Sequence, residues 1–374
     1  MKKYLQAFFI IALLLAACAP AQVAEIEPTR KPVVQEPSPE PTASQAITVV
    51  DALGRTVILP EPPQRIIITG KALIMIADAI YMFPQAAERI VALGASSQGT
   101  GNFTALIDPD YESKAILQQD AAAEQVAALR PDLIILKSYL AGTVGKPLEE
   151  LKIPVVYVDF ETPEQYERDL DILGAIFQDD ARATQLVAFY QDKVAAIRAA
   201  LENTAEKPTV LMLYHSDKDG VIAFSVPPME WMQTRIAEMA GGEPAWASAN
   251  PAGGWTKVTL EQIAAWDADQ VFVISYNKNT ADIVAELKND PQWQALRATR
   301  EGKLYAFPAD IYSWDQPDSR WILGLTWLAA RLHPEVFTNM DITREAREFY
   351  RVLYGLDNAF FEEKILPSFK GDLP

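Results

Sequence analysis

The sequence predicts an α/β fold of two doubly wound lobes bridged by one long helix. Short β-branched apolar runs at residues 65–69, 90–94, 133–137 and 155–158 alternate with helical patterns, as in parallel strands of βα units. A long helical pattern follows, and the alternation then resumes at residue 209. We therefore assign the first lobe to residues 47–178, the bridging helix to 179–203, the second lobe to 204–335 and a helical tail to 336–374.

The individual elements follow from local patterns. Two apolar runs around Gly54 predict a hairpin over residues 47–57, and three prolines separate it from the first buried strand. Apolar residues recur at intervals of three and four from residue 180 to about 203, which predicts a helix about 35 Å long. In the second lobe we expect strands at 209–214, 270–275 and 303–307 and helices at 229–239, 260–266, 281–288 and 319–332.

Composition excludes several classes of protein. The chain has 374 residues, 49% hydrophobic and 22% charged, which is typical of a globular protein. Its 33 basic and 50 acidic residues give a formal net charge of −17, without the basic footprint of nucleic-acid binding. One cysteine excludes a disulfide framework within the chain and a multi-thiolate metal site. The two histidines are too few for the sites that hold a bare transition metal.

The N-terminal segment predicts export and anchoring. Residues 1–17 contain two lysines and then an apolar stretch too short to span a bilayer, which is typical of a secretory signal. The sequence Leu-Ala-Ala-Cys18 resembles the lipobox of bacterial lipoproteins, which implies that the thiol of Cys18 receives the lipid. An ordinary cleavage site is the alternative. Residues 18–46 hold six prolines and neither glycine nor aromatic residues, which predicts an extended tether.

Several motifs, in order, resemble a known family. They are Asp51-Ala-Leu-Gly-Arg, Pro63-Gln-Arg-Ile-Ile, Leu129-Arg-Pro-Asp-Leu-Ile-Ile, the long mid-chain helix and Trp266-Asp-Ala-Asp-Gln-Val-Phe. Over about residues 47–335 this order is similar to the substrate-binding proteins of ABC importers for iron–siderophore complexes and cobalamin. The resemblance implies a non-catalytic protein with a ligand cleft between two lobes. It also implies a place at the outer face of the cytoplasmic membrane, in the periplasm or at the cell surface.

Ligands of open α/β sheets approach the carboxyl ends of the strands, so the loops there are the predicted binding site. The candidates are Lys71, Lys137 and Tyr139 in the first lobe, and His215, Trp255, Tyr276, Tyr312, Trp314 and Arg320 in the second. The cations suit an anionic ligand, and the indoles offer a flat wall to a large chelate or macrocycle. The alternatives are solvated strand ends for the lysines, core packing for the tryptophans, and pairing of Arg320 with Asp315 or Asp318.

Two glutamates occupy corresponding places in the two lobes. Glu124 and Glu261 each precede Gln-(Val or Ile)-Ala-Ala at the start of a predicted helix. In the family resembled, a glutamate at each place pairs with arginines of the membrane permease, so the resemblance implies that both are docking residues. The alternative is that the helix dipole favours an acidic residue in any first turn.

The leading hypothesis is a monomeric, lipid-anchored receptor without a cofactor that serves an ABC permease and its ATPase. It would capture a chelated metal, as an iron–siderophore complex, or a corrinoid. An alternative with the same fold is a molybdate- or tungstate-binding protein that uses Arg320, Lys71 and backbone N–H groups. A remote alternative is a surface hydrolase, suggested by adjacent His215, Ser216 and Asp217. However, neighbours on a strand point apart, and no G-x-S-x-G motif occurs.

Overall fold

The computed structural model describes residues 46–96, 98–204, 206–251 and 253–373. Residues 44–374 form one compact unit. The predicted signal segment, Cys18 and nearly all of the predicted tether lie outside the described residues. No helix within the described ranges is long and apolar enough to cross a membrane.

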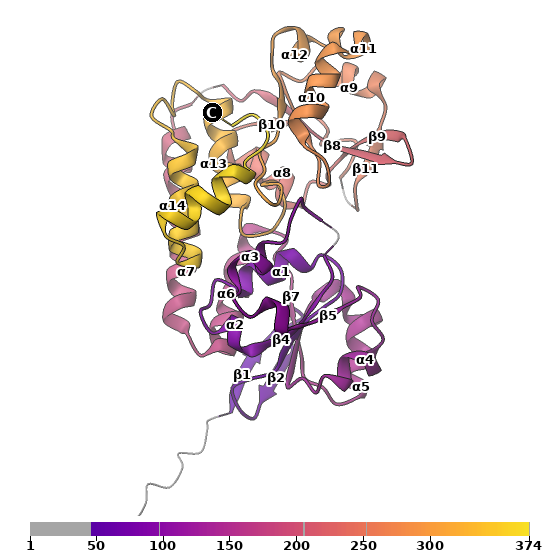
Figure 1. Cartoon of the computed structure of the whole chain (residues 1–374). Helices are drawn as coiled ribbons and strands as arrows, with labels where there is room; N and C mark the ends of the chain where they lie inside the picture. The colour runs from indigo at the N-terminus through magenta and orange to yellow at the C-terminus, as the bar shows by residue number, and fades with distance from the viewer. Residues whose placement is uncertain (1–45, 97, 205, 252, 374) are drawn as a thin grey trace, which may run out of the picture. The chain divides into compact units, whose positions relative to one another are not determined.

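The first lobe is built on a five-stranded, all-parallel sheet (Figure 1). Its strand order is β5-β4-β3-β6-β7, so the chain moves outward from β3 to β5 and then returns to place β6 beside β3. The strands are β3 (Ile66–Ile68), β4 (Ile90–Gly94), β5 (Ala115–Leu117), β6 (Leu133–Lys137) and β7 (Val155–Val158). The four predicted strands are confirmed, and β5 is a short strand that the sequence pattern did not reveal.

Helices cover both faces of this sheet, in agreement with strands that are almost entirely apolar. The helices are α1 (Leu73–Ile80), α2 (Ala86–Arg89), α3 (Phe103–Ile107), α4 (Ala123–Ala128), α5 (Lys146–Glu150) and α6 (Pro163–Phe177). Short helical turns are Tyr111–Ser113, Ser138–Leu140 and Ala141–Gly145. The predicted hairpin is present as β1 (Ile47–Val50) and β2 (Thr56–Leu59), and Gly54 in its turn has a φ of 72°.

The bridging helix is α7 (Asp180–Leu201), as the sequence predicts. It begins where the side chain of Asp179 accepts a hydrogen bond from the N–H of Arg182. Along its length α7 packs against α6 of the first lobe and against α8 (Met232–Met239) and α13 (Trp321–Leu332) of the second. It therefore supports both lobes.

The second lobe contains a six-stranded mixed sheet of order β11-β9-β8-β12-β13, with β10 also paired to β8. Its strands are β8 (Thr209–Lys218), β9 (Val221–Val226), β10 (Glu243–Pro244), β11 (Thr256–Val258), β12 (Gln270–Ile274) and β13 (Leu304–Ala306). The remaining helices of this lobe are α9 (Leu260–Trp266), α10 (Thr280–Asn289), α11 (Pro291–Gln294) and α12 (Arg297–Arg300).

The second lobe departs from a simple repeat of the first. Strand β8 continues beyond the predicted end at residue 214 and pairs with β9 as an antiparallel hairpin. The turn is Asp219-Gly220, with φ values of 54° and 80°, the conformation that two-residue hairpin loops require. Residues 215–217, which follow the predicted strand, are consequently part of it.

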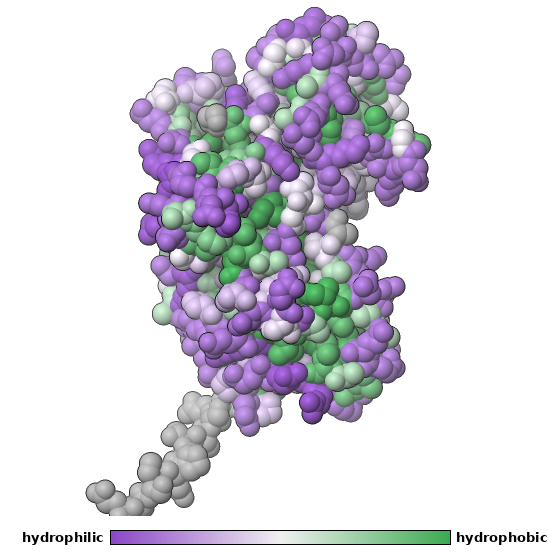
Figure 2. Space-filling view, viewed as in Figure 1, coloured by the Kyte–Doolittle hydropathy of each residue, from purple (hydrophilic) through white to green (hydrophobic). Residues whose placement is uncertain are grey.

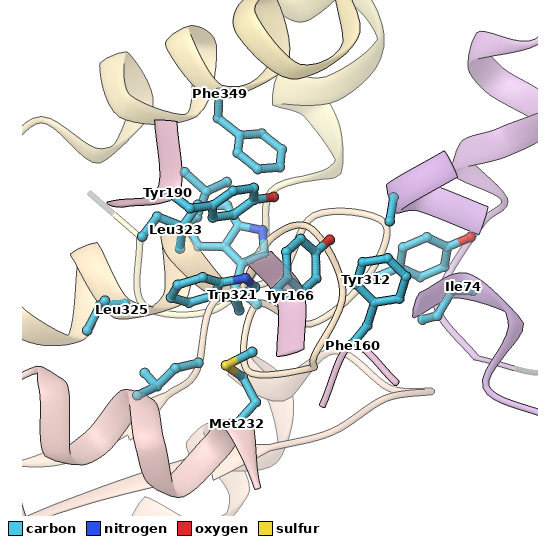
Figure 3. Close-up of a cluster of buried hydrophobic side chains, with 14 of the residues drawn as sticks. Ile74, Phe160, Tyr166, Tyr190, Met232, Tyr312, Trp321, Leu323, Leu325 and Phe349 are labelled. Atoms are coloured by element: carbon cyan, nitrogen blue, oxygen red, sulfur yellow. The ribbon is translucent and has the colours of Figure 1, made fainter. Parts of the chain in front are cut away.

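The C-terminal segment packs against the second lobe and α7. It comprises α14 (Ile342–Tyr354), α15 (Asn358–Phe360) and the turns Phe361–Ile365 and Leu366–Ser368. Its last residues return to the lobe, where the N–H of Lys370 donates to the carbonyl of Ala309 over 2.8 Å. Figure 3 shows Phe349 of α14 among core side chains that come from both lobes.

An aromatic cluster lies where the lobes and α7 meet. Tyr190 of α7 stacks on Trp321 of α13 with ring centroids 5.2 Å apart, and Tyr166 of α6 lies 5.0 Å from Tyr190 (Figure 3). The hydroxyl of Tyr190 donates to the carbonyl of Ser319 over 2.9 Å. The main hydrophobic core is thus continuous between the two lobes.

Candidate ligand-binding cleft

A cavity of about 380 Å³ lies beside α7, but a larger one, of about 480 Å³, takes its lining from both lobes. Its volume lies within the range of about 300–1,000 Å³ that is typical of small-molecule sites. The lining residues are Ala72, Met75, Gln98, Tyr139, Glu161, Trp231, Gln233, Trp255, Tyr276, Gln316 and Pro317. We call this cavity the cleft. Figure 2 shows the viewed face hollowed between the part that holds α9–α12 and the part that holds α4 and α5.

The first lobe contributes the segments that follow its parallel strands. Ala72 and Met75 come after β3, Gln98 after β4, Tyr139 after β6 and Glu161 after β7. Strands β3 and β6 are adjacent although they are distant in the chain, so the cleft lies at the point where the winding of the sheet reverses. Open α/β sheets bind ligands at this point.

Two backbone positions beside the cleft have unusual conformations. Ala72, which caps α1, has a φ of 57°, and Phe160, which precedes Glu161, has a φ of 53°. Left-handed conformations cost a non-glycine residue on the order of 1 kcal/mol, so the surrounding fold must impose them. At Phe160 the reason is visible, because the buried carboxylate of Asp169 accepts hydrogen bonds from the N–H groups of Asp159 and Phe160, over 2.6 and 2.8 Å.

The second lobe contributes an aromatic wall. Trp231, Trp255 and Tyr276 line the cleft, and Tyr214 lies behind them. Tyr214 stacks on Tyr276 with centroids 4.8 Å apart, and Trp231 meets Trp255 edge to face at 5.8 Å. These contacts hold the rings in fixed orientations, as required of a preformed apolar surface.

A buried carboxylate fixes this wall from behind. The hydroxyl of Tyr276 donates to Oδ2 of Asp315 over 2.9 Å, and the amide of Gln233 donates to the same oxygen over 3.2 Å. Burial raises the pKa of Asp315 to about 6, against the stabilising hydrogen bonds from Ser313, Tyr276 and Gln233. Burial also raises the pKa of Tyr276 well above its usual value, so its phenol is neutral at physiological pH.

Two glutamines supply neutral polar groups. Gln233 and Gln316 are only 2% and 1% exposed, yet both line the cleft. Neither amide atom of Gln316, nor Oε1 of Gln233, has a hydrogen-bond partner among the described residues. A buried amide without a partner costs about 1–3 kcal/mol, so these atoms favour a ligand that supplies partners.

The two candidate lysines do not line the cleft. Lys71 is exposed and lies outside the lining. Lys137 is fully buried, and its Nζ lies 2.6 Å from Oε1 of Glu161 and also donates to the carbonyl of Asp159. The interpretation of Lys137 as a free cation for an anionic ligand is wrong, because Glu161 already neutralises it.

Arg320 is also placed differently from the prediction. Its side chain is fully buried, and it pairs with Asp318, as the alternative proposed, and also with Asp310 and Asp78. Its Nε lies 2.7 Å from Oδ1 of Asp310, and Asp78 belongs to the first lobe. Burial raises the pKa of Asp78 to about 6 and that of Asp318 well above its usual value. Arg320 therefore joins the lobes and is not among the residues that line the cleft.

Tyr312 and Trp314 are buried close to Arg320. The hydroxyl of Tyr312 accepts a hydrogen bond from the N–H of Phe103 in the first lobe over 3.2 Å. The indole of Trp314 is fully buried and donates to Asp310 over 3.1 Å. Both were predicted to line the cleft, but both are buried in the core and neither lines it.

His215 lies on β8, against the ring of Phe224 and away from the cleft. Burial lowers the pKa of this imidazole, so it is neutral at physiological pH. Its neighbour Asp217 pairs with Lys278 over 2.6 Å. Consecutive positions on a strand cannot form the triad of the hydrolase alternative. Within the described residues, no group of three or more His, Cys, Asp or Glu side chains could hold a metal ion.

The two candidate docking glutamates have closely matched surroundings. Glu124 and Glu261 are both exposed, in the first turns of α4 and α9. The next residue in each case, Gln125 or Gln262, accepts a hydrogen bond through its side chain from the N–H of the capping residue, over 2.9 Å in both helices. No ion pair to either glutamate is formed within the described part of the chain.

Sequence reasoning placed Tyr139, Trp255 and Tyr276 where they line the cleft and missed the rest of the lining. The missed residues are Ala72, Met75, Gln98, Glu161, Trp231, Gln233, Gln316 and Pro317. The rule that ligands approach the carboxyl ends of strands, which we call the strand-end rule, also selects the loops that hold Gln98, Gln316 and Pro317. These residues are neither cationic nor aromatic, so the predicted chemistry of the ligand did not point to them. Glu161 follows the predicted strand 155–158 and could have been found by the same rule.

Comparisons with known proteins agree with this architecture. The chain is 22% identical over 341 residues to the molybdate-binding protein MolA of Haemophilus influenzae, which covers 83% of this chain and 93% of the relative. It is 26% identical over 209 residues to the Fe(3+)-citrate-binding protein YfmC of Bacillus subtilis, which covers 55% and 61%. A solved periplasmic solute binding protein from Veillonella parvula has the same fold, with a TM-score of 0.68 at 24% identity over 86% of this chain and 97% of the other.

A family model is more decisive than these individual likenesses. The model for periplasmic binding proteins matches residues 86–311, which is more than half of the chain. The match begins in the first lobe, includes the whole of α7 and ends beyond β13. This chain belongs to the periplasmic binding protein family.

Proposed function

We propose that this protein is the substrate-binding component of an ABC importer and captures a metal chelate or a corrinoid in the cleft. The observation that carries this proposal is the aromatic-walled cavity of about 480 Å³ at the carboxyl ends of strands from both lobes. Membership of the periplasmic binding protein family supports a binding role outside the cytoplasm rather than catalysis. The name of the relative YfmC, an Fe(3+)-citrate-binding protein, supports a chelated metal as cargo.

The proposed partner is a membrane permease with its ATPase, and the proposed contacts are Glu124 and Glu261. Their exposure and their matched helix positions support a docking role, since each lobe presents one carboxylate that forms no ion pair among the described residues. Attachment to the membrane through a lipid on Cys18, and action as a monomer, remain parts of the proposal that rest on the sequence.

A second candidate is capture of molybdate, because the relative MolA matches over 93% of its own length. The cleft supports this candidate less well. A small oxyanion needs donors or cations at short range, whereas Lys137 and Arg320 are engaged by carboxylates. Tryptophan fluorescence separates the two, since a corrinoid bound against Trp231 and Trp255 should quench it strongly and molybdate only weakly.

The docking proposal is tested with the variant E124A/E261A. Ligand binding should be unchanged, because neither glutamate lines the cleft, whereas import in cells that carry the cognate permease should be abolished. The matched control is Glu88→Ala, which removes another exposed first-turn glutamate, that of α2. Normal import by the double variant would show that the docking assignment is wrong. Loss of ligand binding would show that the substitutions disturb the fold.

A further inference from the structure

The charge of the cleft lining differs from what an anionic ligand requires. Of the described lining residues, only Glu161 is an Asp or a Glu, and none is Lys, Arg or His. The others are aromatic, apolar or amide side chains. Positive charge must therefore come from beneath or beyond the lining.

The cation beneath the lining is covered by its own partner. Within the ion pair of Lys137 and Glu161, the lysine side chain is 0% exposed and the glutamate side chain is 32% exposed. The ammonium group is also engaged by the carbonyl of Asp159. The backbone of Glu161 is held in place, since its N–H donates to the side chain of Gln165 over 3.0 Å. The carboxylate thus faces the cleft and masks the ammonium group.

The remaining surroundings do not add positive potential. The faces of Trp231, Trp255 and Tyr276 carry the negative side of their quadrupoles, which attracts cations and disfavours anions. Asp315 lies directly behind Tyr276. Beyond the lining, Lys71 is exposed to solvent, where its charge is screened. An anion that entered the cleft would lose its hydration without gaining a counter-charge, which is unfavourable.

The amides of Gln233 and Gln316 fit a ligand with neutral polar groups. Each amide can both donate and accept, and three of their four polar atoms have no partner among the described residues. Carboxamide or hydroxyl groups on a ligand would pair with them without placing a charge in the cleft.

We propose that the cleft selects an uncharged or cationic ligand with a broad apolar face and neutral polar groups, and that Glu161 sets this selectivity by masking Lys137. This inference rests on the proposed function, and it deepens that function by naming the charge class of the cargo. It separates this chain from its relatives MolA and YfmC, which are named for anions.

The test unmasks the lysine with the variant Glu161→Gln. Binding of molybdate and of ferric citrate is measured by equilibrium dialysis, and binding of cyanocobalamin, an uncharged corrinoid, by tryptophan quenching. The wild-type protein should not retain either anion at millimolar concentration. E161Q should bind at least one of them at least about tenfold more tightly, because one negative charge is removed next to a buried positive one. In E161Q the affinity for that anion should therefore rise relative to the affinity for cyanocobalamin.

Two further variants control the test. Glu150→Gln removes an exposed glutamate of α5 in the same lobe and should leave all affinities unchanged. The double variant K137M/E161Q removes both charges and should lose the gain in anion binding. It also serves if E161Q does not fold, because it carries no unpaired charge and should still exclude anions.

Two results would overturn the inference. One is tight binding of molybdate or ferric citrate by the wild-type protein. The other is an E161Q variant that has the wild-type melting temperature and gains no affinity for either anion. Neither result would contradict the proposed function, which the import assay of E124A/E261A tests separately. Conversely, a protein with the expected charge selectivity but no role in import would contradict only the proposed function.

Discussion

Arg320 contacts three buried carboxyl groups drawn from both lobes. Its guanidinium group contacts Asp78, Asp310 and Asp318, all fully buried, and stacks over the ring of Phe103 at 4.6 Å. The pairing with Asp318 could be predicted because that residue is two positions away. The pairing with Asp78, which is 242 positions away, follows only from the topology that brings α1 beside the second lobe.

Replacement of this arginine should be strongly destabilising. In the variant Arg320→Met the three carboxylates would lose their only buried counter-charge among the described residues, and we expect a loss of roughly 3–5 kcal/mol in the free energy of unfolding. Urea denaturation measures this loss. Arg344→Met is the control, since that side chain is 61% exposed and should contribute less than about 1 kcal/mol. Equal effects of the two substitutions would refute the structural role of Arg320.

Asp315 should make stability depend on pH. Its pKa is raised to about 6 by burial, above the ordinary value of 3.8, so between these two values the folded protein binds a proton that the unfolded chain does not. The free energy of unfolding should therefore fall as the pH rises from about 4 to 6, by on the order of 2–3 kcal/mol from this group. Asp315→Asn should remove this part of the slope in urea titrations at several pH values. An unchanged slope would contradict the prediction.

Lys137 shows what the sequence could and could not determine about the cleft. The strand-end rule correctly located the end of β6, since Tyr139 lines the cleft two residues later. The rule does not say which way a side chain at a strand end points. Residues of a parallel strand alternate between faces, and the burial of Lys137 against Glu161 depends on where β7 and its following turn lie. The sequence alone therefore could not identify Glu161 as the partner of Lys137.

At the scale of elements, strongly patterned segments were predictable and short strands were not. Strands β4, β6 and β7 and helix α7 agree with their predicted bounds to within a few residues. Strand β5 has only three residues, which are apolar but not buried, so it is too short to give a recognisable pattern. Strand β9 is half exposed and was not predicted, although its apolar run and the preceding Asp219-Gly220 turn are both signals of a hairpin. Such strands form because the neighbouring strands β4 and β8 supply their hydrogen-bond partners, and a local sequence pattern does not show this.

The loop after β4 should tolerate no side chain at Gly99. This residue has a φ of 90°, and its N–H donates to the carbonyl of Tyr276 in the second lobe over 3.1 Å. A Cβ atom there would lie 2.8 Å from the carbonyl oxygen of Ile311 and 2.4 Å from the ring of Tyr312. Gly99→Ala should therefore combine backbone strain with a steric clash between the lobes.

Gly54→Ala provides the matched control for this clash. Gly54 has a φ of 72°, but no atom lies within 4 Å of a Cβ built on it. Its replacement should cost about 1–2 kcal/mol through strain alone. The Gly99 variant should lose about 1–3 kcal/mol more in urea denaturation. Equal losses would show that the lobes can shift apart to accept the methyl group.

At the scale of the whole molecule, the C-terminal segment is part of the folding unit. Phe349, Tyr350 and Leu353 of α14 are fully buried in the core that both lobes share. The guanidinium group of Arg182 on α7 donates to the carbonyls of Leu353 and Val352 over 2.6 and 3.0 Å. Removal of this segment would expose a large apolar surface and leave several polar groups unpaired.

A chain that ends at residue 340 should therefore lose its cooperative unfolding transition. Near-UV circular dichroism and a urea titration would report the loss of fixed packing around Tyr190 and Trp321, which lie next to α14. The full chain with Arg344→Ala serves as the control, because that side chain points to solvent from the same helix. A cooperative transition at the wild-type urea midpoint in the shortened chain would contradict this prediction.

The bonds between the lobes have a practical consequence for sensor engineering. Arg320 with Asp78, Gly99 with Tyr276, and the hydroxyl of Tyr312 with the N–H of Phe103 all join one lobe to the other close to the cleft. A pair of dyes placed on the two lobes would give a small change in energy transfer on ligand binding, because these bonds oppose hinge closure. A single environment-sensitive dye beside Trp255 or Tyr139, at the mouth of the cleft, would give the larger signal.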